Sequence, residues 1–170
     1  MGFSSVLLER LRTTEDMLAK QLVRDVKEVF STMIGMDDLL HLPLEIDPVN
    51  HFSGCTSALV GLAGTYNGLI SLHVPDELAH NITTSMLGKE AGGDADDDIQ
   101  DALGEVANMI AGSFKQHLTN SGLDIRLSTP SVVTGKRYAI ALTNKPEAMA
   151  LRFAASDEDW FMVAVALEQG

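Results

Sequence analysis

Three polar side chains recur at helical spacing in one largely apolar stretch of the chain, DALGEVANMIAG at residues 101–112. They are the carboxylates of Asp101 and Glu105 and the carboxamide of Asn108. Spacings of four and three residues bring such groups onto one face of an α-helix. A carboxylate accepts hydrogen bonds and pairs with cations, whereas a carboxamide both accepts and donates. The stretch is therefore either a site for a polar partner or the solvated back of an ordinary amphipathic helix.

The helix that carries these groups is predicted from about residue 97 to residue 119, and a helical wheel separates its two faces. With about 100° per residue, one apolar stripe lies within about 60° of Ile99 and should face the core. This stripe consists of Leu103, Val106, Ile110 and Phe114. The opposite face carries Asp101, Glu105, Asn108 and Gly112, with Gly104 and Ala111 at its flanks.

A Glu and an Asn three residues apart on a helix are usually just exposed to water. Two features of this helix weaken that interpretation. Gly104 and Gly112 lie inside it, where each glycine costs about 0.5 to 1 kcal/mol relative to alanine. The surface around the carboxylate and the carboxamide is also expected to be clear of long side chains, so that another protein could approach closely. If this face is a docking site, its candidate residues are Asp101, Gly104, Ala111 and Gly112, and the solvated back of a surface helix remains the alternative.

A second long helix is predicted near the start of the chain. Apolar residues recur at helical spacing over residues 14–34, Thr13 or Thr14 can cap the start, and Gly35 can end it. A short helical turn is expected before it, around residues 7–11. With 170 residues the chain can build one core but not comfortably two. The predicted organisation is an N-terminal extension, residues 1–13, followed by a single domain, residues 14–170.

The remaining elements are mostly extended runs separated by turn signals. An Asn-Gly pair, Asn67 and Gly68, indicates a hairpin between two apolar runs. A helix opened by Pro75 and closed by Gly88 follows, and then an acidic linker, residues 89–98. The predicted strands are residues 42–46, 56–63, 68–74, 125–127, 131–134, 138–142, 149–155 and 160–167, the last two joined by a turn at residues 156–159.

These elements predict an α+β fold, with a twisted, largely antiparallel sheet and the two long helices on one face. Each half of the chain reads as a long helix followed by strands, and the first half closes with a further helix. This order of elements indicates a diverged internal duplication.

Composition excludes several classes of partner. The chain is 45% hydrophobic and carries 24 acidic against 12 basic residues, a formal net charge of -12. Duplex nucleic acid and anionic membrane surfaces would be repelled. The N-terminal residues show neither a secretory signal nor a spanning helix, so a cytoplasmic protein is expected.

No metal or nucleophile motif emerges from the sequence. The five histidines lack paired spacing, and a partial calcium-loop pattern beginning at Asp94 has Ile99 where the sharp turn needs glycine. His117 is expected to be a partly buried packing residue. Cys55 has no basic neighbour that would activate it, and a small buried residue is the better interpretation. No Ser, His and Asp arrangement with a nucleophile elbow is present.

The stretch from Asp101 to Gly112 resembles the signature of the CheC/CheX/FliY phosphatases of bacterial chemotaxis, which is Asp or Ser, three residues, Glu, two residues, Asn. The similarity continues into DIRLSTPSVVTG at residues 124–135 and, upstream, into GTYNGLISL and the MLG at residues 86–88. Family members with two sites repeat the signature in the first long helix, where this chain has Glu28 and Ser31. A single intact site points to the CheX branch.

The resemblance implies a CheC-like domain that dephosphorylates the aspartyl phosphate of a CheY-type receiver domain. Asn108 would orient the attacking water, Glu105 would pair with the receiver's active-site lysine, and Asp101 would assist docking or the start of the helix. No cofactor of its own is implied, because Mg²⁺ would be held by the receiver. A homodimer is implied by the family alone.

Two other functions remain open at this stage. The first is a non-enzymatic receiver-binding adaptor or a flagellar switch-type interaction module of related fold. The second is regulation of another chemotaxis enzyme, such as a receptor-modifying deamidase. Binding of a receiver without faster phosphate loss would favour the first, and capture of the deamidase without a receiver would favour the second.

Overall fold

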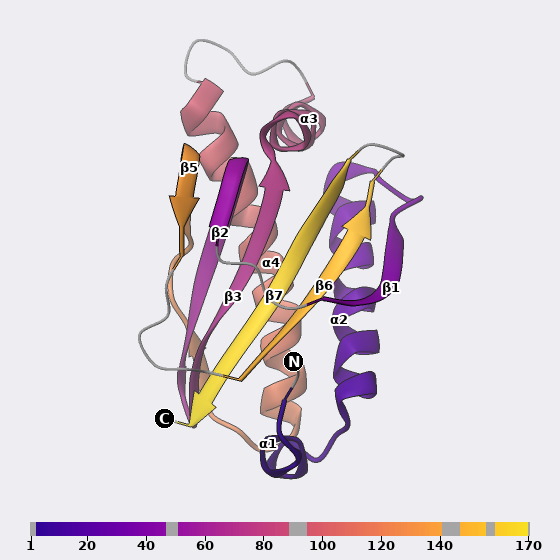
Figure 1. Ribbon diagram of the computed structural model, residues 1–170, viewed down its shortest axis with the longest axis vertical. Coiled ribbons are helices and arrows are strands. Elements are labelled where there is room, and N and C mark those ends of the chain that lie inside the picture. The colour runs from indigo at the N-terminus through magenta and orange to yellow at the C-terminus, as the bar shows by residue number, and fades with distance from the viewer. Residues whose placement is uncertain (1–2, 47–50, 89–94, 141–146, 156–158, 170) are drawn as a thin grey trace.

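The fold is one twisted antiparallel sheet with the two long helices packed side by side against one of its faces (Figure 1). The computed structural model describes residues 3–46, 51–88, 95–140, 147–155 and 159–169. Its helices are α1 (Ser5–Arg10), α2 (Glu15–Val29) with a π-helical continuation η1 (Phe30–Ile34), α3 (Asp76–Leu87) and α4 (Ala95–Asn120). Its strands are β1 (Leu40–Ile46), β2 (His51–Gly64), β3 (Tyr66–Pro75), β4 (Ile125–Leu127), β5 (Ser131–Ala139), β6 (Glu147–Ala154) and β7 (Trp160–Gln169).

Strand order shows how the two halves of the chain interlock. The order is β1-β6-β7-β3-β2-β4, with β5 also paired to β2. Each of these strand pairs is antiparallel. Each half contributes a hairpin, β2 with β3 and β6 with β7, and the hairpins meet at the β3–β7 pair. The strand before each hairpin pairs with the other half's hairpin, β1 with β6 and β5 with β2. The predicted α+β fold and its repeat of elements are confirmed.

The core lies between the sheet and the helices. Leu103, Val106, Ile110 and Phe114 of α4 are fully buried at 0% exposure, so the predicted apolar stripe faces the core. On the side of α2 the rings of Phe30 and Phe161 stack with centroids 4.8 Å apart. The predicted first helix is likewise confirmed: Thr14 caps it by accepting a hydrogen bond from the Met17 amide at 3.1 Å.

The N-terminal extension contributes to this core. The short helical turn expected around residues 7–11 is α1, at residues 5–10. Leu7 of α1 and the flanking residues Phe3 and Leu11 are between 1% and 7% exposed. They belong to the same hydrophobic cluster as the buried residues of α2 and α4. Residues 3–11 are therefore packed against the domain.

The predicted hairpin is correct, but its turn lies elsewhere. β2 ends at Gly64 and β3 begins at Tyr66, so Asn67 and Gly68 lie inside β3, paired with β7. Gly64 has φ +138°, and a Cβ there would stand 2.0 Å from the backbone oxygen of Asp124. This close approach requires glycine at the turn. Asn67, which lies in β3, stabilises the turn by accepting a hydrogen bond from the Gly64 amide at 3.3 Å.

Two further predictions about strands need correction. The runs 131–134 and 138–142 were predicted as separate strands, but residues 131–139 form the single strand β5. Lys136 and Arg137, which lie between the two predicted runs, fit a strand because β5 is mostly exposed. In the acidic linker, residues 95–98 already belong to α4, while residues 89–94 and most of the turn at 156–159 lie outside the described residues.

A buried polar chain occupies the sheet face away from the helices. His73 is 6% exposed, its Nδ1 lies 2.6 Å from Ser57 Oγ, and its Nε2 lies 2.8 Å from Ser71 Oγ. Tyr138 extends the chain with its hydroxyl 2.7 Å from the same Ser57 oxygen. Burial lowers the pKa of His73 from 6.5 to about 4. The imidazole is thus neutral at physiological pH and acts as a structural crosslink between β2 and β3.

This shift of the His73 pKa predicts a pH dependence of stability. The unfolded chain binds a proton at this histidine below pH 6.5 and the folded chain only near pH 4, so stability is complete above 6.5 and declines as the pH falls towards 4. A shift of this size corresponds to about 3 kcal/mol. In urea unfolding between pH 7 and pH 4, the free-energy difference between wild type and His73→Gln should shrink by roughly that amount. Parallel pH profiles for the two proteins would contradict this account.

Candidate functional site

Helix α4 is stabilised by residues at its two ends and by packing along its length. Asp96, Asp97 and Asp98 occupy its first turn, where negative charge complements the helix dipole. The helix ends at Asn120, and Gly122 follows in a left-handed conformation with φ +89°. Between these ends α4 packs against α2, α3 and the sheet.

The three polar groups of interest project from the part of α4 that the sheet does not cover. Asp101 and Glu105 are exposed and Asn108 is half-buried, as the helical wheel indicates. Within the described part of the chain, none of the three side chains makes a hydrogen bond or an ion pair. The carboxylates and the carboxamide are consequently free to bind groups on another molecule.

Two of the predicted docking residues are not on this surface. Ala111 is fully buried, and Gly104 is buried beneath the segment between β4 and β5. A Cβ at Gly104 would meet Pro130 Cβ at 3.5 Å and Val132 Cγ2 at 3.7 Å. The helical wheel assigned both residues to an open flank because it assumes one buried side, whereas α4 is also covered on a second side. Gly104 can act only indirectly, by allowing Pro130 to lie close to the helix.

The other flank of the polar face is open. Gly112 is partly exposed, and an added Cβ there would have nothing within 4 Å. Next to Asn108, the side chain of Met109 is 42% exposed. The expectation that this face lacks long side chains is therefore wrong at Met109, which the helical wheel itself places beside Glu105. The accessible surface comprises Asp101, Glu105, Asn108, Met109 and Gly112.

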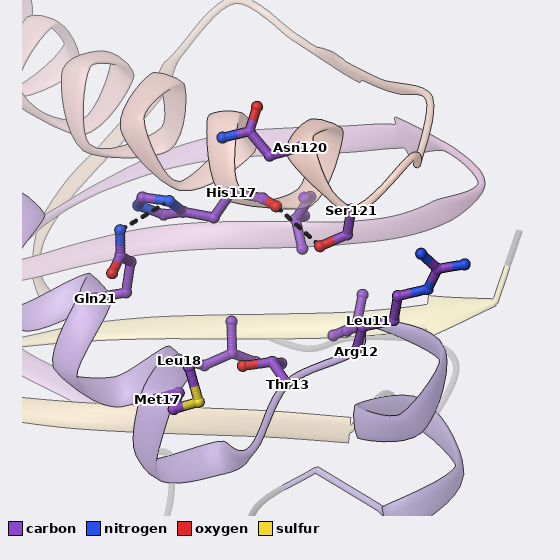
Figure 2. A pocket seen from close by; sticks show the side chains of 10 residues that line it. Leu11, Arg12, Thr13, Met17, Leu18, Gln21, His117, Asn120 and Ser121 are labelled. Carbon is purple, nitrogen blue, oxygen red and sulfur yellow. Dashed lines mark hydrogen bonds between the residues drawn. The ribbon is translucent and has the colours of Figure 1, made fainter.

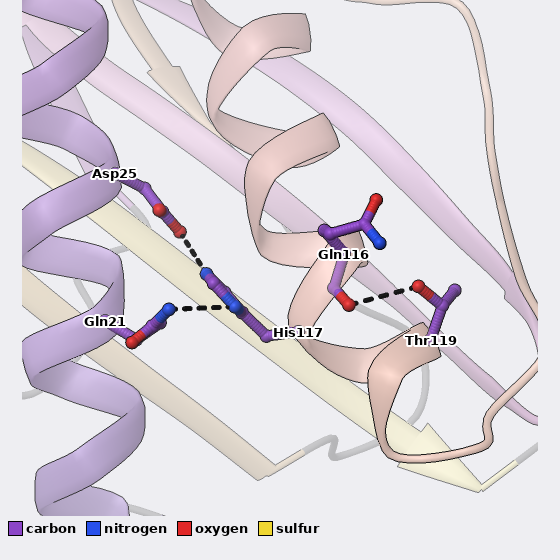
Figure 3. Close-up of polar contacts among 5 residues, drawn as sticks. All are labelled: Gln21, Asp25, Gln116, His117 and Thr119. Atoms are coloured by element: carbon purple, nitrogen blue, oxygen red, sulfur yellow. Dashed lines mark hydrogen bonds and ion pairs between the residues drawn. The ribbon is translucent and has the colours of Figure 1, made fainter.

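A polar contact fixes α4 to α2 about two and a half turns beyond Asn108 (Figure 3). His117 Nε2 lies 2.9 Å from Asp25 Oδ2, and its Nδ1 lies 2.9 Å from Gln21 Nε2. Burial raises the pKa of Asp25, although His117 acts in the opposite direction. His117 was predicted to be a partly buried packing residue. The structure adds that it ties together the two long helices.

The same end of α4 borders a small pocket, which Figure 2 shows between α4 and the start of α2. Its volume is about 220 Å³, and its polar lining comes from Arg12, Thr13, Gln21, His117, Asn120 and Ser121. None of the residues of the polar face contributes to it. The pocket and the polar face are separate features of one helix.

The first long helix presents no equivalent polar face. Glu28 is exposed, but Ser31 stands in the π-helical turn and donates a hydrogen bond from its hydroxyl to Asp37. A hydroxyl so engaged lacks both the reach and the paired donor and acceptor of a carboxamide. Of the two long helices, only α4 thus has a Glu followed three residues later by an Asn on an accessible face in its described part.

The described residues hold neither a metal cluster nor a membrane-spanning helix. Among them, no three His, Cys, Asp or Glu side chains are grouped so that they could hold a metal ion. Asp94, which begins the calcium-like pattern, lies outside the described residues. No described helix has the length and apolar character needed to cross a membrane. Cys55, predicted to be a small buried residue, is partly buried, and burial raises the pKa of its thiol.

Known proteins are similar to this chain in both sequence and fold. Residues 56–154 match the family model described as chemotaxis phosphatase CheX. The chain is 22% identical over 123 residues to the CheY-P phosphatase CheX of Thermotoga maritima, covering 72% of this chain and 79% of that protein. The crystal structure of the chemotaxis protein CheX from Desulfovibrio desulfuricans has 32% identity and a TM-score of 0.76, covering 89% of this chain and 99% of that one.

A second similar structure is that of a complex. It is the CheX-CheY-BeF3-Mg²⁺ complex from Borrelia burgdorferi, with a TM-score of 0.76 over 89% of this chain and 98% of that one. Its sequence identity of 21% makes it evidence for the fold alone.

Proposed function

The chain belongs to the CheX family of chemotaxis phosphatases, and we propose that it hydrolyses the aspartyl phosphate of a CheY-type receiver domain with Glu105 and Asn108 of α4. The observation that carries this proposal is the exposed face of α4, where a carboxylate and a carboxamide one turn apart have no partner in the described chain. Groups without internal partners on a fixed helix are available to a bound substrate.

The reaction asks little of the phosphatase beyond positioning. An acyl phosphate already has a good leaving group, the aspartate carboxylate, and the receiver would supply Mg²⁺ to balance the charge of the phosphoryl oxygens. What is needed is a water molecule held in line with the bond that breaks. Water attacks phosphorus, the bond from phosphorus to the aspartyl oxygen breaks, and inorganic phosphate and the free carboxylate are formed.

Asn108 is the residue whose chemistry fits this task. Its carboxamide oxygen accepts a hydrogen bond from the water, and its amide nitrogen donates one to a phosphoryl oxygen. Because α4 is held by core packing on one side and by the His117 contact at its end, the carboxamide is inserted by a rigid element. A carboxylate in its place would repel the phosphoryl group.

Glu105 and its neighbours would hold the receiver in register. The carboxylate of Glu105 would pair with the receiver's active-site lysine in a charge-assisted hydrogen bond. Asp101 lies one further turn towards the start of α4 and would contribute to docking. Gly112 gives the partner room, and Met109 offers it apolar contact area. Asp101, Glu105, Met109 and Gly112 thus surround Asn108 with a docking surface.

We further propose that the protein acts in the cytoplasm as a homodimer, as family membership suggests. Its formal net charge of -12 suits a protein that must stay soluble and avoid anionic surfaces.

Mixing the purified protein with each phosphorylated receiver of the source organism tests the proposed activity. Release of inorganic phosphate should be faster than the receiver's own hydrolysis for at least one receiver. Binding to a receiver with no acceleration would contradict the enzymatic proposal and favour an adaptor or switch-type module.

Replacing Gly112 with leucine should change stability and activity in opposite directions. Leucine is the better helix former, and the added side chain meets open space, so the free energy of unfolding should rise by about 0.5 to 1 kcal/mol. The same side chain intrudes on the docking surface, so KM for the phosphorylated receiver should rise several-fold. Urea unfolding and steady-state phosphate release measure the two effects. Unchanged KM would place the docking surface elsewhere.

A further inference from the structure

A second pocket opens on the sheet face that the helices do not cover. Residues on β6 and β7 alternate between the two faces: Phe153 and Phe161 belong to the core beneath the helices, whereas Met162 belongs to a separate cluster with Phe52. The pocket lies beside this second cluster and has a volume of about 240 Å³. A cavity of about 150 Å³ is enough to hold one benzene ring. This pocket is therefore large enough for a single substituted ring.

The floor of the pocket is rigid. Phe52 stacks on His73 with centroids 4.2 Å apart and an angle of 10° between the rings. His73 is held at both ring nitrogens by Ser57 and Ser71. Because burial keeps the pKa of His73 at about 4, this floor carries no charge at neutral pH. An apolar ring can lie against it with little reorganisation.

The wall of the pocket carries the positive charge of Arg152. Arg152 stacks over Trp160 with Cζ 4.5 Å from the ring centroid. Its Nε is shielded from solvent and has no hydrogen-bond partner among the described residues. A guanidinium is shaped to bind a carboxylate through two parallel hydrogen bonds, and because Nε is shielded, a ligand would bind at the two terminal nitrogens. Trp160 itself is 49% exposed, so the wall is open to a ligand.

The chemistry of the lining narrows the class of ligand. Phe52, Trp160, Met162 and Pro75 supply apolar surface, and Arg152 supplies the positive charge. A cationic ligand is disfavoured by the guanidinium. A phosphate or sulfate would leave most of the apolar lining unused, and among the described lining residues it would find one arginine or lysine only, Arg152. An apolar ring that bears one carboxylate can contact the apolar lining with its ring and pair with Arg152 through its carboxylate.

We propose that this pocket binds a small aromatic carboxylate, with the ring between Phe52, Trp160 and Met162 and the carboxylate on the guanidinium of Arg152. The site lies on the face of the sheet opposite α4, so a bound ligand leaves Glu105 and Asn108 accessible. The proposal does not depend on the phosphatase activity, and its test requires no receiver.

Phenylacetate and its neutral counterpart phenylacetamide are suitable probes. Trp160 is the only tryptophan in the chain, so its fluorescence reports directly on the wall of the pocket. Titration of the full-length protein with phenylacetate should give a saturable change of emission and a matching heat of binding by calorimetry. Phenylacetamide should bind at least tenfold more weakly, because it cannot form the charge-assisted pair with Arg152.

Substitution of Arg152 completes the test. Arg152→Gln should lower the affinity for phenylacetate at least tenfold and remove the preference over phenylacetamide. Arg126→Gln is the matched control, since it removes an exposed cation from β4 and should leave both affinities unchanged. If Arg152→Gln fails to fold, the comparison of the two probes on wild type still decides. No saturable binding of phenylacetate up to about ten millimolar, or equal affinity for the two probes, would overturn the proposal.

Discussion

Replacing Asn108 with alanine should lower kcat/KM for the phosphorylated receiver by about two to three orders of magnitude. Removal of one group that orients a reactant or stabilises a transition state has effects of this size in other enzymes. The loss should appear in kcat, because in the proposed mechanism Asn108 contacts the water and the phosphoryl group and contributes little to docking. Steady-state phosphate release over a range of receiver concentrations measures both constants.

The Asn108→Ala protein should remain folded, so a loss of activity can be assigned to the carboxamide. Asn108 makes no hydrogen bond within the described chain, and alanine is the better helix former. Asn120→Ala is the matched control: it removes an exposed carboxamide from the end of the same helix and should retain wild-type activity. Equal losses in the two variants would mean that the effect is not local to the polar face.

Replacing Glu105 with lysine should abolish productive binding of the receiver. The proposed partner is a lysine, and placing two like charges together at an interface costs several kcal/mol, which corresponds to about a thousandfold or more in kcat/KM. Glu105→Gln keeps the shape and removes the charge, so a smaller loss of about ten- to a hundredfold is expected. The loss should raise KM more than it lowers kcat, and binding measurements with the phosphorylated receiver should show the same order.

The first long helix provides the control for this substitution. Glu28 occupies the corresponding position of the degenerate signature and is exposed, so Glu28→Lys makes the same change of charge at a place with no carboxamide beside it. Its activity should stay near the wild-type value. If Glu28→Lys and Glu105→Lys lost activity equally, the effect would come from net charge and not from a contact at the site.

The sequence predicts the polar face well because that prediction rests on periodicity alone. Asp101, Glu105 and Asn108 are accessible, and the opposite stripe from Leu103 to Phe114 is buried, since a regular helix packed on a sheet must divide its residues in this way. The resemblance to chemotaxis phosphatases then supplied the reaction, and the match to the CheX family agrees with it.

The predictions that fail are those that depend on contacts between distant segments. Gly104 lies under Pro130, and Ala111 is fully buried. The buried part of the α4 surface is therefore wider than a helical wheel with one buried and one exposed face predicts. The hairpin turn at Gly64 is fixed by the backbone of Asp124, sixty residues away. β5 continues through Lys136 and Arg137 because β2 offers it an edge. Local patterns contain no information about any of these neighbours.

The contact between His117 and Asp25 could not be predicted from the sequence either. A histidine near the end of one helix and a carboxylate ninety-two positions earlier show no shared pattern, yet they meet at 2.9 Å. Pairing of charged and polar residues across helices becomes visible only when the packing of α2 on α4 is known. The same holds for Arg152 and Trp160, which come together because β6 and β7 are neighbours.

The most direct test of the central claim is the rate of phosphate loss from a phosphorylated receiver when the phosphatase is present at saturating concentration. Under these conditions docking is complete, and the plateau rate reports on the oriented water alone. The account predicts that Asn108→Ala saturates at a concentration similar to that of wild type but reaches a plateau lower by about a hundredfold or more, close to the receiver's own rate. A wild-type plateau for Asn108→Ala would contradict the claim that this carboxamide positions the attacking water.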